Sequence, residues 1–201
     1  MTPASRGRGQ AHTLEAVTAA LLLIASIGIA LQMTAVTPLS ASTSSQHLEN
    51  QLKSTSEGVL ASAAESGGLR DAVLSWNESA GEFHGVEDRG FYSDGPPGTT
   101  LGAALNQTLD QRNVAYNVYV VYQTPGGGTE RKRLVYSGQP SDHAVSAGRT
   151  VTLTDDDHLL DDDGDPTATT VADSASFFVP ETGSGNGVYN HVRVEVVTWR
   201  I

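Results

Sequence analysis

An uninterrupted apolar stretch near the N-terminus constrains this chain more than any other feature of its sequence. Beyond Glu15 the chain reads AVTAALLLIASIGIALQMTAV, and no Asp, Glu, Lys or Arg follows until Glu49. As an α-helix, residues 16–36 span about 31 Å, which is close to the hydrocarbon thickness of a bilayer. We therefore expect one membrane-spanning helix in contact with the lipid bilayer.

The charges beside this stretch predict its orientation. Arg6 and Arg8 precede it, and no cation follows it closely. Because cytoplasmic flanks are enriched in Lys and Arg, residues 1–15 are expected to be a basic cytoplasmic leader of a single-pass protein in the cell membrane. Two alternatives remain open: a secretory signal that is cut near residues 38–41, and a buried core helix.

Glu15 stands directly before the apolar stretch, where a carboxylate is costly to bury. A short basic segment ending in Gly precedes it, and its last residues are Arg8, Gly9 and Gln10. Together these features resemble the N-termini of type IV pilin-like proteins, which carry a class III signal peptide. The RGQAHTLEA-type start is also similar to that of a group of haloarchaeal membrane proteins with acidic exteriors.

The resemblance to pilins implies how this N-terminus would be used. A leader peptidase would cut between Gly9 and Gln10 on the cytoplasmic side and leave the apolar helix in place. Glu15 would then be the sixth residue, one later than the commonest pilin spacing, and would pair with the N-terminal amine of a neighbouring subunit. The implied partners are other pilin-like subunits and a membrane assembly platform. Alternatively, Glu15 is an N-terminal helix acid stabilised by the helix dipole.

The chain beyond the apolar stretch begins with a helical segment. Pro38 is able to kink or end the apolar helix, because proline lacks a backbone donor. Residues 37–67 are expected to form a junction and then an amphipathic stem helix, since apolar residues recur there at helical spacing. Gly67 and Gly68 are expected to end this stem.

Residues 68–201 are expected to form an acidic extracellular domain. Residues 69–76 fit either a helix or a strand, and residues 101–111 have helical spacing. A helix-led start followed by antiparallel strands predicts an α+β fold with a small, β-rich ectodomain. Strands are expected at residues 114–122, 130–136, 150–154, 175–179 and 188–201.

The composition excludes some functions and favours an acidic surface. The chain has 23 Asp and Glu against 12 Lys and Arg, and its net charge of −11 argues against nucleic acid as a partner. Lys53 and Lys132 are its only lysines. Such a surface is typical of halophilic proteins, because at 1 M salt charge repulsion is screened within about 3 Å, and the resemblance of the N-terminus implies an archaeal source. An ordinary acidic protein is the alternative. Cysteine is absent, so disulfides are excluded.

An aspartate-rich run at residues 155–165 is the most conspicuous polar segment, with seven carboxylates. An EF-hand is excluded, because Leu159 and Thr170 stand where its first and last acids are needed. We expect a solvated loop, since like charges this close repel one another. The weaker alternative is a calcium loop that uses Asp161, Asp163 and Asp165.

Two triplets fit the N-glycosylation pattern, at Asn77 and Asn106. Asn77 is expected to be the more accessible, because it lies beside a turn, whereas Asn106 lies in the predicted helix. His84, near Glu82, Glu87 and Asp88, is expected in a solvated loop, and a metal site is the alternative. The sequence has no nucleophile elbow, no HExxH motif and no phosphate loop, so we expect no enzyme activity and no cofactor.

These observations predict a pilin-like, membrane-anchored cell-surface protein. Its role would be that of a minor subunit of a type IV-type filament or pseudopilus. The alternative is a permanently anchored extracytoplasmic binding domain that has no filament role.

Overall fold

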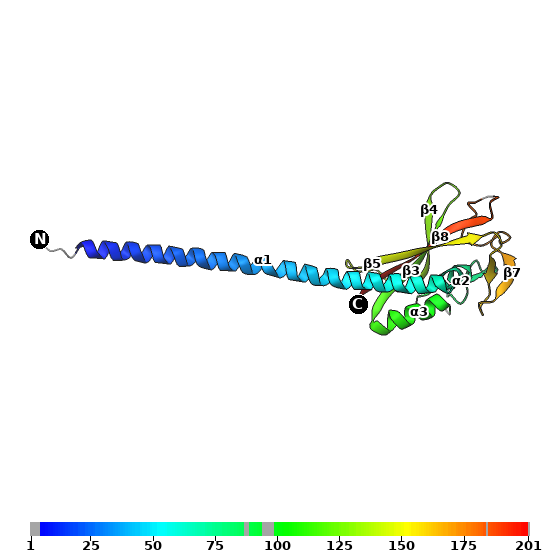
Figure 1. The fold of residues 1–201 in the computed structure, drawn as a ribbon, viewed down its shortest axis with the longest axis horizontal. Coiled ribbons are helices and arrows are strands. Elements are labelled where there is room, and N and C mark those ends of the chain that lie inside the picture. Colours follow the sequence, from blue (N-terminus) through cyan, green and yellow to red (C-terminus); the bar gives the residue numbers. More distant parts are fainter. Residues whose placement is uncertain (1–4, 87–88, 94–98, 184, 201) are drawn as a thin grey trace. The chain divides into compact units, whose positions relative to one another are not determined.

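The computed structural model describes residues 5–86, 89–93, 99–183 and 185–200, without the side chains of residues 5–11 and 32–44 (Figure 1). Its internal contacts divide the chain into two units, Met1–His47 and Leu48–Ile201. The second unit, here called the C-terminal domain, contains all the strands that the structure describes.

Helix α1, Ser5–Glu65, is the longest element. Pro38 was expected to kink or end the helix; the backbone stays helical through it, so the helix does not end there. Proline removes a single amide donor, and the turns on either side of it retain their own hydrogen bonds. The helix ends at Glu65, as expected from the glycine pair that follows it, and Gly67 adopts a φ of 81°, which favours glycine.

Two short helices follow the stem. Helix α2 is Gly68–Leu74 and α3 is Thr100–Thr108, which a 3₁₀ turn, η1 (Asp110–Arg112), extends. The Thr99 side chain caps α3 by accepting a hydrogen bond from the amide of Gly102 at 3.2 Å. A Cβ at Gly68 would lie 2.9 Å from the Cβ of Thr100, so glycine there allows α2 and α3 to pack closely.

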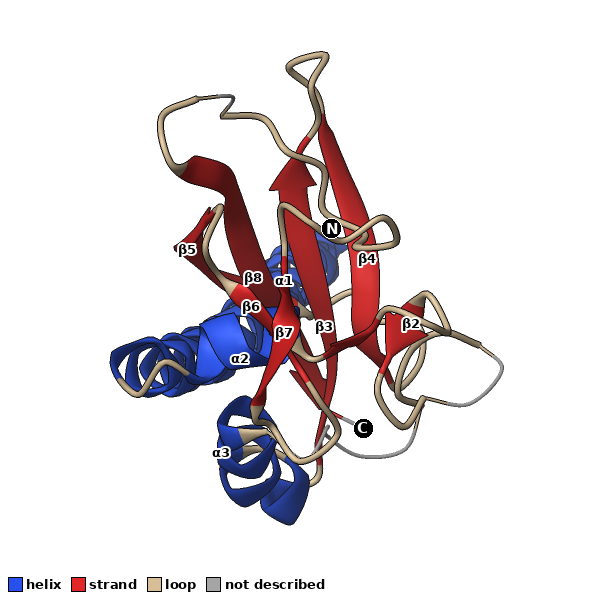
Figure 2. Ribbon diagram, turned by 90° about the vertical axis from the view of Figure 1, so that its right-hand side faces the viewer, coloured by secondary structure: helices blue, strands red, loops and turns tan. Residues whose placement is uncertain are grey.

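A four-stranded antiparallel sheet forms the centre of the C-terminal domain, in the order β4-β3-β8-β5 (Figure 2). The central strands confirm the predictions, whereas β5 begins before the predicted residue 150. The strands are β3, Val114–Gln123; β4, Thr129–Tyr136; β5, Val145–Thr154; and β8, Val188–Arg200.

One face of this sheet is covered by the helices. In β8 the alternating residues Val192, Val194 and Val196 are fully buried, as is Thr198, whose hydroxyl lies 3.3 Å from that of Ser56 in α1. They pack in one hydrophobic core with residues of the stem and the two short helices. We call this the covered face, and the opposite one the open face. The core residues from the helices are Val59, Leu60, Ala63, Leu69, Ala72, Val73, Leu74, Leu101 and Leu105.

The register between β3 and β4 contains a bulge. Val118 pairs with Val135, but the next residue, Tyr119, pairs with Arg133, so Leu134 is the extra residue. Both Leu134 and Val135 are therefore buried. Beyond the bulge, the alternation along β4 is shifted by one residue.

Two small hairpins complete the domain. Strands β1, Trp76–Asn77, and β2, Glu82–Phe83, pair with each other, and so do β6, His158–Leu160, and β7, Pro166–Thr170. The predicted strand at residues 175–179 is wrong. Phe177 and Phe178 instead pack against Trp76, with ring centroids 6.3 Å and 4.9 Å away.

The α+β prediction, with a small antiparallel domain after an N-terminal apolar helix, is confirmed. The two ends of α1 differ sharply in burial: Leu60 is 1% exposed, whereas Leu22 is 72% exposed. The stem therefore belongs to the core of the C-terminal domain.

We predict that Leu60→Ala destabilises the C-terminal domain by about 2–5 kcal/mol, because it leaves a cavity in the core. Leu22→Ala removes the same atoms from an exposed position and is the matched control, with no expected effect. Urea unfolding of the detergent-solubilised chain, followed by tryptophan fluorescence, measures both. Equal midpoints for the two variants would contradict the assignment of the stem to the core.

Candidate functional site

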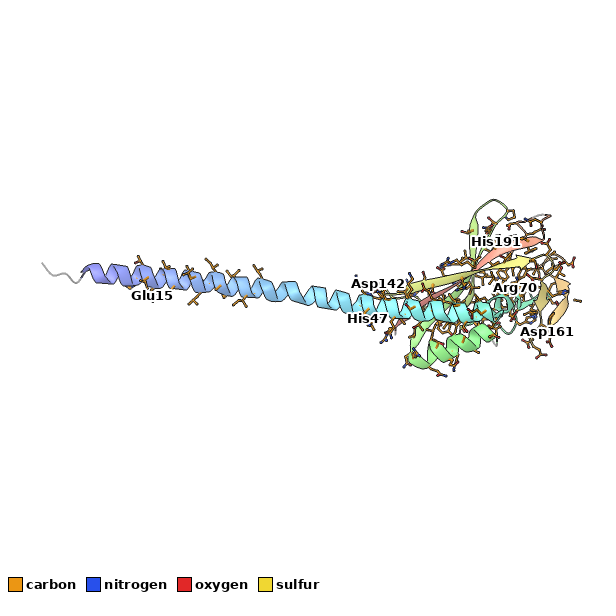
Figure 3. The ribbon with its side chains drawn as sticks, viewed as in Figure 1. Glu15, His47, Arg70, Asp142, Asp161 and His191 are labelled. Atoms are coloured by element: carbon orange, nitrogen blue, oxygen red, sulfur yellow. The ribbon has the colours of Figure 1, made fainter. Side chains whose placement is uncertain are left out.

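The N-terminal part of α1 exposes an apolar surface that no described residue covers. Its apolar span is His12–Leu31, with a mean hydropathy of 2.2 and none of it buried. Figure 3 shows the side chains of this span projecting around the helix. The span is long and apolar enough to cross a membrane, as membrane anchors and signal sequences both are. It starts before the predicted residue 16, because it includes residues on both sides of Glu15.

Glu15 is exposed on this helix and is not held by a strong interaction. Its Oε2 lies 3.7 Å from Nδ1 of His12, one turn earlier, and both side chains are about four-fifths exposed. Thr18 donates its hydroxyl hydrogen bond to backbone carbonyls of the preceding turn rather than to the carboxylate. Gly9 and Gln10 lie within α1, and the side chain of Gln10 is outside the part of the chain that the structure describes.

The aspartate-rich run is more ordered than the sequence predicts. It forms much of the β6–β7 hairpin, in which Leu159 and Leu160 are buried, so the expectation of a solvated loop is wrong for this part. Two apolar residues in the middle of the run bury enough surface to hold the hairpin against the core. The exposed tip of the hairpin is solvated as expected.

Asp157 fastens this hairpin to the rest of the domain. Its Oδ1 accepts a hydrogen bond from Nη1 of Arg70 at 2.9 Å, and its Oδ2 accepts one from the amide of Thr154 at 2.8 Å. Arg70 also donates to the carbonyl of Thr152 at 2.7 Å. The Arg70 side chain thus connects α2 to both β5 and the start of the hairpin.

The tip of the hairpin is a turn built around Asp161. Its Oδ1 accepts hydrogen bonds from the amides of Asp163 and Asp165, at 3.0 Å and 2.9 Å. Gly164 occupies the left-handed region, with a φ of 85°. Within the described part of the chain, no group of three or more acidic or histidine side chains is arranged to hold a metal. The calcium alternative for Asp161, Asp163 and Asp165 stays a prediction.

A cleft of about 520 Å³ lies between this turn, α2 and the start of α3. His84 lines this cleft, and its Nε2 lies 3.0 Å from the carbonyl oxygen of Leu160. The His84 side chain is half-buried, so the expectation of a solvated loop is wrong for this residue. Tyr92 donates its hydroxyl hydrogen bond to the carbonyl of His84. The residues that line the cleft are Asp71, Ser75, His84, Gly85, Tyr92, Thr99, Thr100, Leu160, Asp161, Asp162, Asp163 and Gly164.

The electrostatics of the cleft are acidic. Burial raises the pKa of Asp71, and the nearby Arg70 partly opposes this shift. Burial, together with the charge of Asp162, raises the pKa of Tyr92 to about 12, so this phenol stays a hydrogen-bond donor further into the alkaline range than an ordinary tyrosine. With four aspartates among its lining residues, the cleft suits cationic or hydroxyl-rich small molecules. The sequence did not predict this cleft, because its walls come from five separated segments.

The two candidate glycosylation sites differ from the expectation. Asn106 is exposed on α3, and its Nδ2 lies 3.4 Å from Oδ2 of Asp110. Asn77 is half-buried in β1, where its Oδ1 accepts a hydrogen bond from the amide of Ala80. The expected order of accessibility is therefore reversed, because pairing with β2 partly covers Asn77 whereas Asn106 lies on the solvent side of its helix.

The fold and these sites define a class of protein in which one N-terminal apolar helix leads into a small α+β domain. The chain belongs to a family of unknown function (DUF7288), which it matches over residues 8–198. No curated protein and no solved structure matches the chain.

We predict that Asp157→Ala lowers the free energy of unfolding by about 1–2 kcal/mol, since Arg70 loses its charged acceptor and the Thr154 amide loses its partner. Hydrogen exchange of the amides in His158–Leu160 should also quicken. Asp163→Ala, which removes an exposed carboxylate from the same hairpin, is the control. Unchanged exchange in the Asp157 variant would show that Arg70 does not fasten the hairpin.

Proposed function

We propose that this protein is a pilin-like, membrane-anchored cell-surface protein that serves as a minor subunit of a type IV-type filament or pseudopilus. Residues 1–15 are the basic cytoplasmic leader, of which residues 1–9 are removed by cleavage. The apolar part of α1 is both anchor and assembly helix, and the C-terminal domain faces the outside. The partners are a leader peptidase, an assembly platform and other pilin-like subunits.

The observation that carries this proposal is the exposed apolar span of α1, of which no residue is buried. Large aliphatic side chains such as Leu21, Leu23 and Ile24 are each more than half exposed. Burying a side chain of this kind is worth about 1.5–3 kcal/mol, so a whole span of them requires a bilayer or the helices of neighbouring subunits. Arg6 and Arg8, before the span, favour a cytoplasmic N-terminus.

The position of Glu15 supports an assembly role for this helix. It is the only acidic residue in the apolar span, and among the described residues its one ion-pair partner is the exposed His12. A carboxylate inside a bilayer needs a positive partner, and a plain anchor gives it none. The amine of a neighbouring subunit, freed by cleavage after Gly9, is a partner of the required charge.

The cleft beside Asp161 favours a second function, that of a permanently anchored binding domain for a small molecule. In that case α1 is a simple tether, and Glu15 has no partner in another chain. The fate of the N-terminus distinguishes the two functions, since only a subunit needs cleavage.

We predict that the protein extracted from membranes of its native host begins at Gln10, as intact-mass analysis would show. Gly9→Leu should leave the chain starting at Met1 or Thr2, because the peptidase of this class requires a small residue before the cut. Gly7→Leu places the same side chain two residues earlier and should leave processing unchanged. A wild-type N-terminus at Met1 or Thr2 would contradict the filament role.

We predict that Glu15→Gln reduces incorporation into sheared surface filaments at least tenfold, because the neutral amide cannot pair with the amine charge. Glu57→Gln makes the same change on an exposed position of α1 within the C-terminal domain, and incorporation should stay normal. Quantitative blotting of sheared and membrane fractions measures both. Equal incorporation of the Glu15 variant and the wild type would remove the pairing role.

A further inference from the structure

The open face of the sheet collects arginines from two strands. In the register of the sheet, Arg131, Val121 and Arg193 lie side by side on β4, β3 and β8, and Arg133, Tyr119 and Glu195 form the next row. With strands about 4.8 Å apart and alternate residues about 7 Å apart, the backbones of the three arginines lie within about 12 Å of one another. We call Arg131, Arg133 and Arg193 the basic sheet face.

The bulge at Leu134 is the reason that these arginines point to the same side. It shifts the alternation of β4, so Lys132 pairs with the buried Val120 on the covered face, while Arg131 and Arg133 flank it on the open face. Lys132 there lies 4.8 Å from the centre of the Trp76 ring. Neighbouring cations are thus divided between the two faces.

Ring and glycine contacts hold the three guanidinium groups in place. That of Arg131 lies 3.8 Å above the ring of Tyr119, and that of Arg133 lies 4.4 Å from the ring of Tyr136. The Arg193 side chain packs directly on Gly148: a Cβ added at Gly148 would lie 2.4 Å from Nε of Arg193. Because stacking and close packing restrict these side chains before binding, little conformational entropy remains to be lost when they bind an anion.

This face is unusual in a chain with 23 acidic and 12 basic residues. Glu195 is the only acid on the open side of the four strands, all of whose residues are described, and its Oε2 lies 3.7 Å from Nη1 of Arg131. Within the described part of the chain, Arg193 forms no ion pair. The face thus retains positive charge that an anionic partner can neutralise.

The densest group of carboxylates lies on the other side of the sheet. The β6–β7 hairpin packs against the covered face through Leu159, Leu160 and Val171, and Asp162 and Asp163 are exposed at its tip. Both surfaces belong to one compact unit, so a chain cannot bring its own tip to its own basic face. A second copy can do so.

We propose that the basic sheet face binds the Asp162–Asp163 tip of a second copy of this chain. Guanidinium groups recognise carboxylates through paired hydrogen bonds, and these two surfaces have opposite charge. Each copy has one surface of each kind, on opposite sides, so the contact is heterologous and extends into open chains unless the rotation closes a ring. This interface goes beyond the proposed function, because it requires neither cleavage of the leader nor Glu15.

The test is a charge exchange in the full-length chain in detergent micelles, at about 0.15 M salt, where exposed charges are screened beyond about 8 Å. Sedimentation velocity should show wild-type species that grow with protein concentration. R131E/R193E and D162K/D163K should each weaken self-association at least tenfold. An equimolar mixture of the two variants should associate again, because each then meets the opposite charge.

Matched charge changes outside the interface are the controls. R112E/R200E and D142K/E181K alter exposed residues by the same charges and should associate like the wild type. Wild-type association by R131E/R193E, or a mixture of well-folded variants that stays dissociated, would overturn the proposal. A wild-type chain that remains monomeric but binds polyglutamate through Arg131 and Arg193 would also overturn the proposal. An N-terminus at Met1 would contradict the filament role alone and leave this contact standing.

Discussion

The burial of the covered face of the sheet is the constraint on which the rest of the C-terminal domain depends. The end of α1, together with α2 and α3, covers the face that carries Val192, Val194 and Val196, and the hairpin of β6 and β7 extends this layer. A two-layer domain of this kind has one core and one open sheet face. The charged surfaces of the domain lie on different layers: the acidic cleft lies in the helical layer, and Arg131, Arg133 and Arg193 lie on the open face.

Much of the fold follows from local patterns in the sequence. Alternation in β8 and the dense Val and Tyr content of β3 indicate strands whatever surrounds them, and the pair Gly67 and Gly68 ends the stem helix as expected. The β6–β7 hairpin was not predicted, because the seven aspartates around Leu159 and Leu160 indicate a solvated loop, whereas both leucines are buried. Phe177 and Phe178 read as part of a strand, although their burial comes from rings in distant segments.

The candidate sites were predictable only where they are local in sequence. Glu15, Gly9 and the apolar span can be read directly from the chain, since their proposed roles depend on spacing along one helix. The cleft cannot, because Asp71, His84 and Asp161 come together only after folding. The basic sheet face depends on a single extra residue at the bulge, and no periodicity in the Glu130–Arg133 segment reveals which cations share a side.

The two edges of the sheet are protected against pairing with strands of other chains by different means. On β4, the backbone of Tyr92 bonds to that of Leu134 and Tyr136, and the charged residues Glu130–Arg133 occupy the remaining length. On β5, the Arg70 guanidinium donates a hydrogen bond to the backbone carbonyl of Thr152. Exposed sheet edges are templates for aggregation, and charge on an edge strand opposes it. Both edges of the sheet therefore carry features that oppose the addition of a strand from another chain.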